Sequence, residues 1–361
     1  MKNLWNYIKD KSYYFLGGTV IIIILLIIIT SCSGGNGNDY EAIEEKMVSA
    51  AKKYYENKKD HLPKEEGNSV KVTISSLVES ELMKEVTDPK DSSNECSGYV
   101  EVTKVDDEYS YVPFLTCKGN YEPEYLVDKI KKVKTDELGN GVYTIGNEYV
   151  YRGSDVNNYV SFNDLTWRII KVDENNDIKL VLATRTNESY SWDTKYNPER
   201  EDYSGNTSDY LLTDIRKTLN DYYDQTFTKE SKSKIVAKNL CIGKYTLTDQ
   251  FSTEKECSII KENEKIGLLN LSDYQNASLD SNCTNLDSMS CVNRNYLASE
   301  DIYTWTLNIS SENSYKVMYL NETIDESTAS NQRRINPVIY LSGKVITNDG
   351  DGSLEKPYVI K

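Results

Sequence analysis

An uncharged apolar segment near the N-terminus constrains most strongly what this chain can become. Residues 15–29 carry no charged side chain, and Thr19 is the one polar residue among these 15. This length is short for a membrane-spanning helix but suits the apolar region of a signal peptide. Lysines precede the segment and acidic residues follow it, so the positive-inside rule keeps the N-terminus in the cytoplasm. We therefore expect the remainder of the chain to be exported.

The end of this segment predicts how the protein is held at the membrane. Ile29-Thr30-Ser31-Cys32 resembles a bacterial lipobox, which implies that Cys32 becomes a lipidated N-terminus. The alternative is an uncleaved anchor helix that ends at Ser31. The cysteine count favours the lipobox, because the chain has seven cysteines and the six other than Cys32 suit three disulfides in an exported protein. Residues 1–32 are thus a signal peptide or membrane anchor, and residues 33–39 are a Gly-rich tether to the extracytoplasmic face of the cell membrane.

Charge and composition exclude several classes of function. The chain has 42 basic and 57 acidic residues, a net charge of −15, which opposes binding to nucleic acid or to an anionic membrane surface. Its single histidine, His61, is expected near a helix C-terminus, where it suits a dipole partner better than a catalytic base. No CxxC spacing occurs and the compartment is oxidising, so the cysteines are interpreted as structural. We predict no metal and no cofactor.

The length of the exported part predicts two domains, because 330 residues follow residue 31 and one compact core seldom holds that many. We place the domains at residues 40–138 and 139–361. A charged helical segment over 121–138 is expected to join them. Gly139-Asn140-Gly141 breaks this segment and is expected to be among the first protease-sensitive sites.

Local patterns predict the elements of the first domain. Apolar residues at helical spacing indicate a helix over 40–57, and alternation over 70–74 indicates a strand with one buried side. A capping-box pattern that starts at Ser76 predicts a second, short helix through about Lys84.

Two cysteines predict the register of a hairpin. Cys96 and Cys117 are equally distant from the pair Asp106-Asp107, so a two-residue turn there would place the cysteines opposite each other. Their disulfide would close the open end of the hairpin. A longer turn, with the disulfide just outside the ladder, is the alternative. Pro113 cannot donate a ladder hydrogen bond, so its strand is expected at a sheet edge.

The second domain is expected to begin with an antiparallel meander. Short β-branched and aromatic runs extend from Gly141 to Leu182 and are separated by Gly-Asn, Asn-Asn or Asn-Asp pairs. A helix is expected over 210–223. Pairing each remaining cysteine with its neighbour in sequence gives Cys241 with Cys257 and Cys283 with Cys291, and each bond would stabilise a loop by about 2 to 3 kcal/mol. The predicted fold class is α+β, with long loops held by disulfides.

The first domain resembles the soluble part of a type IV pilin-like or pseudopilin-like protein, of the kind found in exported proteins of gut Firmicutes. The segments that carry the resemblance are EEKMVSAAKKYY, LPKEEG, SLVESELMKEVTDP and CSGYVEV, within residues 40–125. A pilin has one continuous helix where this chain has an apolar segment, a Gly-rich tether and a separate helix. That departure puts assembly into a filament in doubt.

Residues 141–361 resemble an uncharacterised domain family of exported bacterial proteins, which looks like the C-type-lectin-like fold of the formylglycine-generating sulfatase-modifying proteins. The matching segments, in order, are residues 167–170 (WRII), TDIRKTLNDYYDQTF, residues 266–269 with 272–274, residues 305–307 and residues 334–341 (RINPVIYL). The resemblance implies an antiparallel sheet with long loops. It implies no activity, because one fold hosts many functions.

An aromatic cluster is the candidate ligand surface. It lies mainly in the long connection over 186–206, where polar residues separate the rings, and binding residues are concentrated in such loops. The candidate ligand-contact residues are Tyr190, Trp192, Tyr196, Tyr203 and Tyr210. Trp167 and Trp305, by contrast, are expected in the core.

Three classes of function remain. The favoured one is a membrane-tethered extracytoplasmic binding or adhesion protein that presents a lectin-like domain, with the cell membrane and a glycan or surface protein as partners. A carboxylate-dependent glycan-active enzyme needs no histidine and is the second. A pilin-like structural subunit is the third. An oxidase similar to the formylglycine-generating proteins would need a free reactive cysteine pair, which the expected disulfides consume.

Overall fold

The computed structural model describes residues 38–65, 68–105, 108–298, 303–321, 323–347 and 350–360. The chain divides into two compact units, of which the first ends at Glu122 and the second begins at Pro123. The expected signal or anchor segment, Cys32 and residues 33–37 of the expected tether lie outside the described residues. Within the described residues, no helix is both long and apolar enough to cross a membrane. The mixed α+β class is confirmed, with more residues in strands than in helices.

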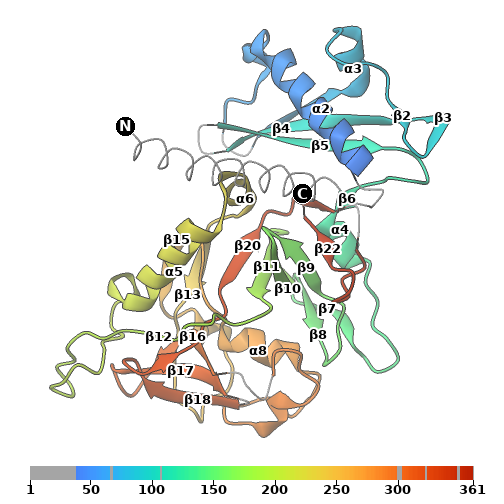
Figure 1. Cartoon of the computed structure of the whole chain (residues 1–361). Coiled ribbons are helices and arrows are strands. Elements are labelled where there is room, and N and C mark those ends of the chain that lie inside the picture. Colours follow the sequence, from blue (N-terminus) through green and yellow to red (C-terminus); the bar gives the residue numbers. More distant parts are fainter. Residues whose placement is uncertain are drawn as a thin grey trace, which may run out of the picture. The chain divides into compact units, whose positions relative to one another are not determined.

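In the first unit a long helix packs on an antiparallel sheet (Figure 1). Helix α2 (Asn38–Glu56) includes the last two residues of the expected tether. It buries Met47, Ala50 and Ala51 against the sheet. Within the described part of this unit the sheet has the strand order β1 (Ser69–Thr73), β4 (Ser97–Val105), β5 (Glu108–Thr116). The remaining elements are η1 (Lys59–His61), α3 (Ile74–Glu79), β2 (Thr87–Asp88) and β3 (Asp91–Glu95).

The short helix α3 begins earlier than the capping-box pattern predicted. Thr73 is its N-cap, and the Thr73 hydroxyl accepts a hydrogen bond from the Ser76 amide at 3.1 Å. The helix ends at Glu79 rather than near Lys84. Glu81 has a φ of 57°, a left-handed conformation that an α-helix does not accommodate.

The hairpin has the register that the cysteines predicted. Val105 pairs with Glu108 and Ser97 pairs with Thr116, which leaves two residues, 106 and 107, between the paired strands. The turn residues themselves lie outside the described part of the chain. Cys96 and Cys117 form a disulfide at the open end. Among the described strands, β5, which contains Pro113, pairs with β4 alone and is therefore an edge strand, as expected.

The second unit is built around a twisted sheet of seven strands among the described residues (Figure 1). Its path is β20 (Val338–Leu341), β11 (Ile178–Leu182), β10 (Leu165–Val172), β8 (Glu148–Arg152) and β7 (Gly141–Ile145). Strand β9 (Tyr159–Phe162) pairs with β10 and with β22 (Tyr358–Val359). The consecutive pairs β7–β8, β9–β10 and β10–β11 are antiparallel, as expected, but β8 pairs with β10 rather than with β9, so the chain does not follow the simple meander that was predicted.

Smaller sheets and helices complete the second unit. A described sheet has the order β14 (Lys244–Tyr245), β16 (Thr304–Ser310), β17 (Lys316–Asn321), β18 (Thr323–Thr328). Two-stranded pairs are β6 (Glu124–Tyr125) with β21 (Ile346–Thr347), β12 (Tyr190–Ser191) with β19 (Gln332–Arg333), and β13 (Lys238–Cys241) with β15 (Ile260–Glu264). The helices are α4 (Leu126–Lys131), η2 (Tyr210–Leu212), α5 (Asp214–Thr226), α6 (Lys229–Lys234), α7 (Thr253–Glu256), α8 (Leu271–Ala277) and η3 (Met289–Val292).

The division between the units differs from the expected boundary after Leu138. Helix α4 buries Leu126, Val127 and Ile130 in the core of the second unit, so the segment expected to join the domains belongs to the second one. The turn at residues 139–141 is ordered as well. Asn140 is buried, donates to Asp136 Oδ2 at 3.0 Å and accepts from the Ser154 amide at 3.1 Å. These contacts argue against an exposed linker at this point.

The disulfides and the tryptophans of the second unit follow the sequence expectations. Cys241 is bonded to Cys257, and Cys283 is bonded to Cys291. Trp167 and Trp305 are fully buried in the core. The helix expected over 210–223 is instead a 3-10 turn, η2, followed by α5, because Thr213 is in an extended conformation between them.

Candidate functional site

Two of the five aromatic residues expected to contact a ligand are core residues. Trp192 is fully buried, and its indole Nε1 donates to the Thr306 carbonyl at 3.2 Å. Tyr210 is 2% exposed, with its ring centroid 5.9 Å from that of Trp192. A side chain without accessible surface cannot contact a ligand, so the prediction was wrong for Trp192 and Tyr210.

The other three aromatic residues differ in exposure. Tyr190 is half-buried in β12, packs against the core and donates its hydroxyl to Glu188 at 3.0 Å. Tyr196 and Tyr203 are exposed, and their rings meet edge to face with centroids 5.7 Å apart. The expected cluster of five rings is therefore not one surface.

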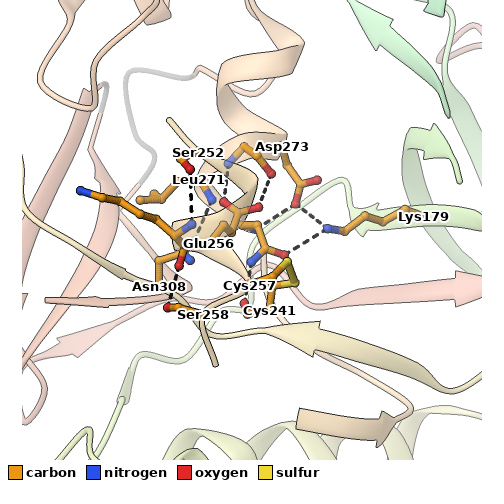
Figure 2. The surroundings of a disulfide bond; sticks show 12 residues. Lys179, Cys241, Ser252, Glu256, Cys257, Ser258, Leu271, Asp273 and Asn308 are labelled. Carbon is orange, nitrogen blue, oxygen red and sulfur yellow. Dashed lines mark hydrogen bonds and ion pairs between the residues drawn. A yellow bond between two sulfur atoms is a disulfide. The ribbon is translucent and has the colours of Figure 1, made fainter. Parts of the chain in front are cut away.

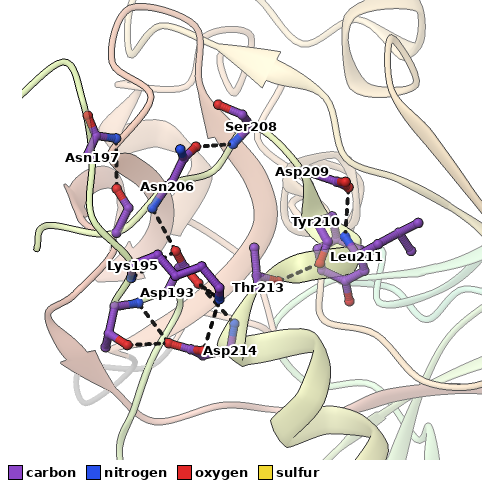
Figure 3. Close-up of polar contacts among 12 residues, drawn as sticks. Asp193, Lys195, Asn197, Asn206, Ser208, Asp209, Tyr210, Leu211, Thr213 and Asp214 are labelled. Atoms are coloured by element: carbon purple, nitrogen blue, oxygen red, sulfur yellow. Dashed lines mark hydrogen bonds and ion pairs between the residues drawn. The ribbon is translucent and has the colours of Figure 1, made fainter.

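The polar residues between these rings hold the connection in place (Figure 3). Asp193 is fully buried and accepts from Lys195 Nζ at 2.7 Å, from the Asn206 amide at 2.8 Å and from the Asp214 amide at 3.2 Å. Lys195 Nζ also reaches Asp214 Oδ1 at 3.2 Å. Burial lowers the pKa of Lys195, but the hydrogen bonds to the two carboxylates outweigh it and raise this pKa above its ordinary value. The network stabilises the loop, and the carboxylates of Asp193 and Asp214 are both hydrogen-bonded to Lys195.

A pocket elsewhere in the second unit has a composition that suits a ligand. Its volume is about 400 Å³, and it lies where β10, β11 and the segment before β20 meet. It is lined by Arg168, Val181, Leu182, Ala183, Thr184, Arg185, Leu269, Tyr296, Leu297, Arg334 and Asn336. The chain has eight arginines, so three of the eight converge on this one pocket of a protein whose net charge is −15.

Strand pairing explains why these residues meet. Arg168 in β10 lies opposite Val181 in β11, and Val181 in turn lies opposite Val338 in β20. Directly paired residues of neighbouring strands share one face of a sheet. Asn336 and Pro337 immediately precede β20. The Pro337 carbonyl accepts a hydrogen bond from the Leu182 amide at 2.9 Å.

Arg168 is held by neutral groups. Its guanidinium carbon lies 4.5 Å from the ring centroids of both Tyr159 and Tyr296. Nε donates to Asn158 Oδ1 at 2.8 Å, and Nη1 donates to the Tyr296 carbonyl at 3.3 Å. Burial lowers the pKa of Arg168 from its ordinary value, whereas Tyr296, Tyr159 and Asp155 raise it in part. The guanidinium remains cationic, since arginine does not deprotonate in proteins.

Arg334 and Asn336 complete the polar part of the pocket. Arg334 is exposed, and its side chain forms no ion pair or hydrogen bond with the described residues. Asn336 Nδ2 donates to the Leu182 carbonyl at 3.1 Å. Asn336 Oδ1 is buried and has no hydrogen-bond partner among the described residues. The pocket thus combines arginine side chains with leucine side chains.

A buried ion pair joins β11 to α8 (Figure 2). Lys179 Nζ in β11 lies 2.6 Å from Asp273 Oδ2 in α8, and Asp273 Oδ2 also accepts from the Asn270 amide at 2.8 Å. Asn270 donates through Nδ2 to the Cys241 carbonyl at 2.8 Å. These bonds join the N-terminus of α8 to β11 and to β13, the strand that contains Cys241. Leu269, which lines the pocket, immediately precedes the N-cap residue Asn270 of α8.

Glu256 is the second buried acid near this pair. Its Oε2 accepts from the Ser272 amide at 2.9 Å in the first turn of α8. Burial raises the pKa of Glu256, although the hydrogen bonds from Ser272 oppose the change. All of these groups are engaged with one another, so the cluster serves as a support for α8. Among the described residues, no group of three His, Cys, Asp or Glu side chains is placed to hold a metal ion.

Comparisons of the chain with protein-family models, with curated proteins and with solved structures found no match.

Sequence reasoning missed this pocket, although its signals were present. Arg168 interrupts the apolar strand Trp167-Arg168-Ile169-Ile170, and Arg334 and Asn336 flank Ile335 just before a buried strand. A charged residue inside a largely buried strand is uncommon and indicates a specific partner or site. In the sequence these segments supported only the fold resemblance, because no pattern in neighbouring residues shows that Arg168 lies close to Arg334 and Asn336 in the fold.

Proposed function

We propose that this chain is an exported, membrane-tethered binding protein and that the arginine pocket of the second unit is its ligand site. The lipobox resemblance at Cys32 and the Gly-rich residues that follow it support a tether. The pilin-like resemblance of the first unit and the C-type-lectin-like resemblance of the second belong to the same proposal: a spacer and a ligand-binding head on the extracytoplasmic side of the membrane.

One observation carries the proposal. Three arginines line a pocket of about 400 Å³ that also has leucine side chains in its wall. Binding sites for small molecules are typically concave, largely apolar and equipped with a few convergent polar groups. Guanidinium groups match carboxylate and phosphate oxygens in geometry and charge, so the first expectation is a small anionic ligand. The net charge of −15 opposes polyanions in general but does not cancel a local cluster of this kind.

Binding is favoured over glycan hydrolysis at this pocket. A glycosidase places two carboxyl groups on either side of the bond that it cleaves. The described residues that line the pocket include no aspartate and no glutamate. The carboxylates of Asp193, in the connection over 186–206, and Asp214, in α5, do not line the pocket and are engaged with Lys195.

A blocked pocket tests the proposal without knowledge of the ligand. The full chain, purified in detergent, would be screened for thermal stabilisation by a library of sugars, organic acids and cell-wall fragments. Thr184 lines the pocket and is exposed, so Thr184→Trp should fill the pocket with little effect on folding. Stabilisation by a compound should be lost in Thr184→Trp and retained in the matched control Thr253→Trp, at an exposed position in α7. A screen without any stabilising compound, or one whose active compounds ignore Thr184→Trp, contradicts the proposal.

A further inference from the structure

We infer that Lys179 and Asn270 become joined by a covalent amide bond inside the second unit, with Asp273 as the acid–base group that promotes the reaction. The bond forms between Lys179 Nζ and Asn270 Cγ, and one ammonia leaves. This modification site is separate from the arginine pocket, so the inference does not depend on the proposed function.

The three side chains lie together in the interior of the second unit (Figure 2). Lys179 Nζ lies 2.6 Å from Asp273 Oδ2 and 3.4 Å from Asn270 Oδ1. All three residues are buried. An amine, the side-chain amide that it would attack and a carboxylate are therefore in contact at a place from which bulk water is largely excluded. The ion pair is the arrangement before the reaction.

Hydrogen bonds hold the Asn270 side chain beside the amine. Asn270 Nδ2 donates to the Cys241 carbonyl at 2.8 Å, and the Asn270 backbone amide donates to Asp273 Oδ2 at 2.8 Å. Lys179 lies in β11, which is paired with β10 on one side and with β20 on the other. Two groups that are held in contact react as if at an effective concentration of roughly 10⁵ M or more. This proximity compensates for the low reactivity of an amide toward an amine.

The carboxylate provides a way to deprotonate the lysine. An ammonium group has no lone pair, so Lys179 must lose a proton before it can attack a carbonyl carbon. Asp273 Oδ2, which lies 2.6 Å from Nζ, is placed to take that proton. A neutral amine beside a neutral carboxylic acid avoids the cost of keeping two charges in a site of low polarity. Desolvation activates lysine nucleophiles for the same reason.

The atoms and electrons of the reaction balance without an added reagent. After Asp273 has taken one proton, the Nζ lone pair forms the Nζ–Cγ bond and the carbonyl electron pair moves to Oδ1. Asp273 then delivers its proton to Nδ2 and takes a second proton from Nζ. As the carbonyl re-forms, the Cγ–Nδ2 bond breaks with its electron pair on nitrogen, and ammonia leaves. No group is oxidised or reduced, and the product joins residues 91 apart in sequence.

A second contact between a lysine and an asparagine serves as an internal control. Lys131 Nζ lies 2.6 Å from Asn176 Oδ1, but this contact is exposed to solvent. Lys131 also forms no ion pair with the described residues. Water favours the protonated form of an exposed amine, and no carboxylate is placed to take the proton. We therefore expect no bond between Lys131 and Asn176.

Peptide mass spectrometry of the full chain, purified in detergent, tests the inference. The chain is reduced, alkylated and digested with trypsin, which cleaves after a free lysine but not after an acylated one. The digest should contain residues 172–185 linked to residues 266–294, with a mass about 17 Da, one ammonia, below the sum of the two peptides. Separate peptides 172–179 and 180–185, with 266–294 unlinked, would overturn the inference. Loss of ammonia from 266–294 alone would indicate a succinimide and would also overturn it.

Variants assign the reaction to the residues. Asn270→Ser removes the amide but keeps a residue type that is favoured at the N-cap of α8, so trypsin should then cleave after Lys179. Asp273→Asn keeps the amine and the amide but removes the acid–base group, so the yield of linked peptide should fall at least tenfold. Cleavage after Lys131 should be complete in the wild-type chain and in both variants.

Each unexpected result contradicts a stated part of the inference. An unchanged yield of linked peptide in Asp273→Asn would exclude Asp273 as the acid–base group. A bond between Lys131 and Asn176 would show that neither burial nor a carboxylate is required. The wild-type digest decides whether the bond exists even if Asp273→Asn fails to fold, and none of these results bears on ligand binding by the arginine pocket.

Discussion

Lys179 Nζ lies 2.6 Å from Asp273 Oδ2, and the two side chains are only 4% and 2% exposed. The pair joins the central strand β11 to the first turn of α8, immediately after pocket residue Leu269. Removing one partner of a buried pair leaves the other charge without compensation. The attachment of α8 to β11 therefore depends on this pair, although neither residue lines the pocket.

Asp273→Ala should destabilise the second unit by about 3 to 5 kcal/mol, because it strands the buried ammonium group of Lys179. Chemical denaturation followed by tryptophan fluorescence measures the loss. The control is Asp221→Ala in α5, which removes a partner from the exposed pair Lys217–Asp221 and should cost less than about 1 kcal/mol. Equal effects of the two substitutions would contradict the assignment of Asp273 to a buried ion pair.

The Cys96–Cys117 disulfide should stabilise the first unit alone. Replacing both cysteines by alanine removes a cross-link between residues 21 apart in sequence, with an expected loss of about 3 kcal/mol in the loop-entropy model. The tryptophans of the described residues, Trp167, Trp192 and Trp305, all lie in the second unit. Unfolding followed by far-UV circular dichroism should therefore shift to lower denaturant while the fluorescence transition stays in place.

A non-reducing digest supplies the direct check of the same disulfide. It should yield one peptide pair that contains Cys96 and Cys117. A bond from Cys96 to any cysteine of the second unit, or a fluorescence transition that shifts together with the dichroism, contradicts the division into two units with their own disulfides.

Regularities over short stretches of sequence predicted the local structure well. The equal spacing of Cys96 and Cys117 from residues 106–107 predicted the register, because side chains alternate along a strand and a slip of one residue would separate the cysteines. Met47 and Ala51 are four residues apart, which places them on the same face of a helix. This spacing predicted α2 and its buried face.

Features that depend on distant contacts were missed or wrong. The pocket joins residues of β10, β11 and the segment before β20, and no local pattern shows that Arg168 and Arg334 meet. Trp192 was expected on the surface because polar residues flank it. Its neighbour Asp193 instead accepts a hydrogen bond from the Asn206 amide of the same connection, while the ring of Trp192 enters the core. The boundary was placed too late, because the charged residues of α4 hid the three apolar ones that it buries.

Lipidation of Cys32 is the test of the proposed tether, and this residue lies outside the described part of the chain. Mass spectrometry of the membrane fraction should find a mature N-terminus at a lipidated Cys32. Cys32→Ser should abolish the lipid and the cleavage. Recovery of the wild-type chain with an intact Met1 would exclude the lipobox and favour the uncleaved anchor helix.

The stability of the first unit should depend on pH through Asp88. Burial alone would raise the pKa of this carboxylate, but hydrogen bonds to it lower the pKa to about 2. The donors are Asn120, Tyr40, the Lys90 amide and Asn94. Because the folded pKa lies below the ordinary value of 3.8, the stabilisation is complete above about pH 4 and is lost as the pH falls toward 2.

Thermal unfolding of the first unit, followed by circular dichroism between pH 2 and pH 6, checks this dependence. Asp88→Asn should lower the midpoint at pH 6 and flatten the fall toward pH 2, since the titrating group is gone. Asp60→Asn, at an exposed position in η1, should keep the wild-type profile. An unchanged slope in Asp88→Asn would show that another group causes the acid sensitivity.

Trp192 and Tyr203 belong to the same connection but should respond oppositely to truncation. Trp192 is fully buried, packs near Tyr210 and donates to the Thr306 carbonyl, so Trp192→Ala should destabilise the second unit by about 3 to 5 kcal/mol. Tyr203 is 75% exposed, and Tyr203→Ala should change the stability by no more than about 0.5 kcal/mol. Denaturation followed by near-UV circular dichroism measures both. If Trp192→Ala unfolds no more easily than Tyr203→Ala, the indole is not part of the core, and the aromatic connection becomes a candidate ligand surface again.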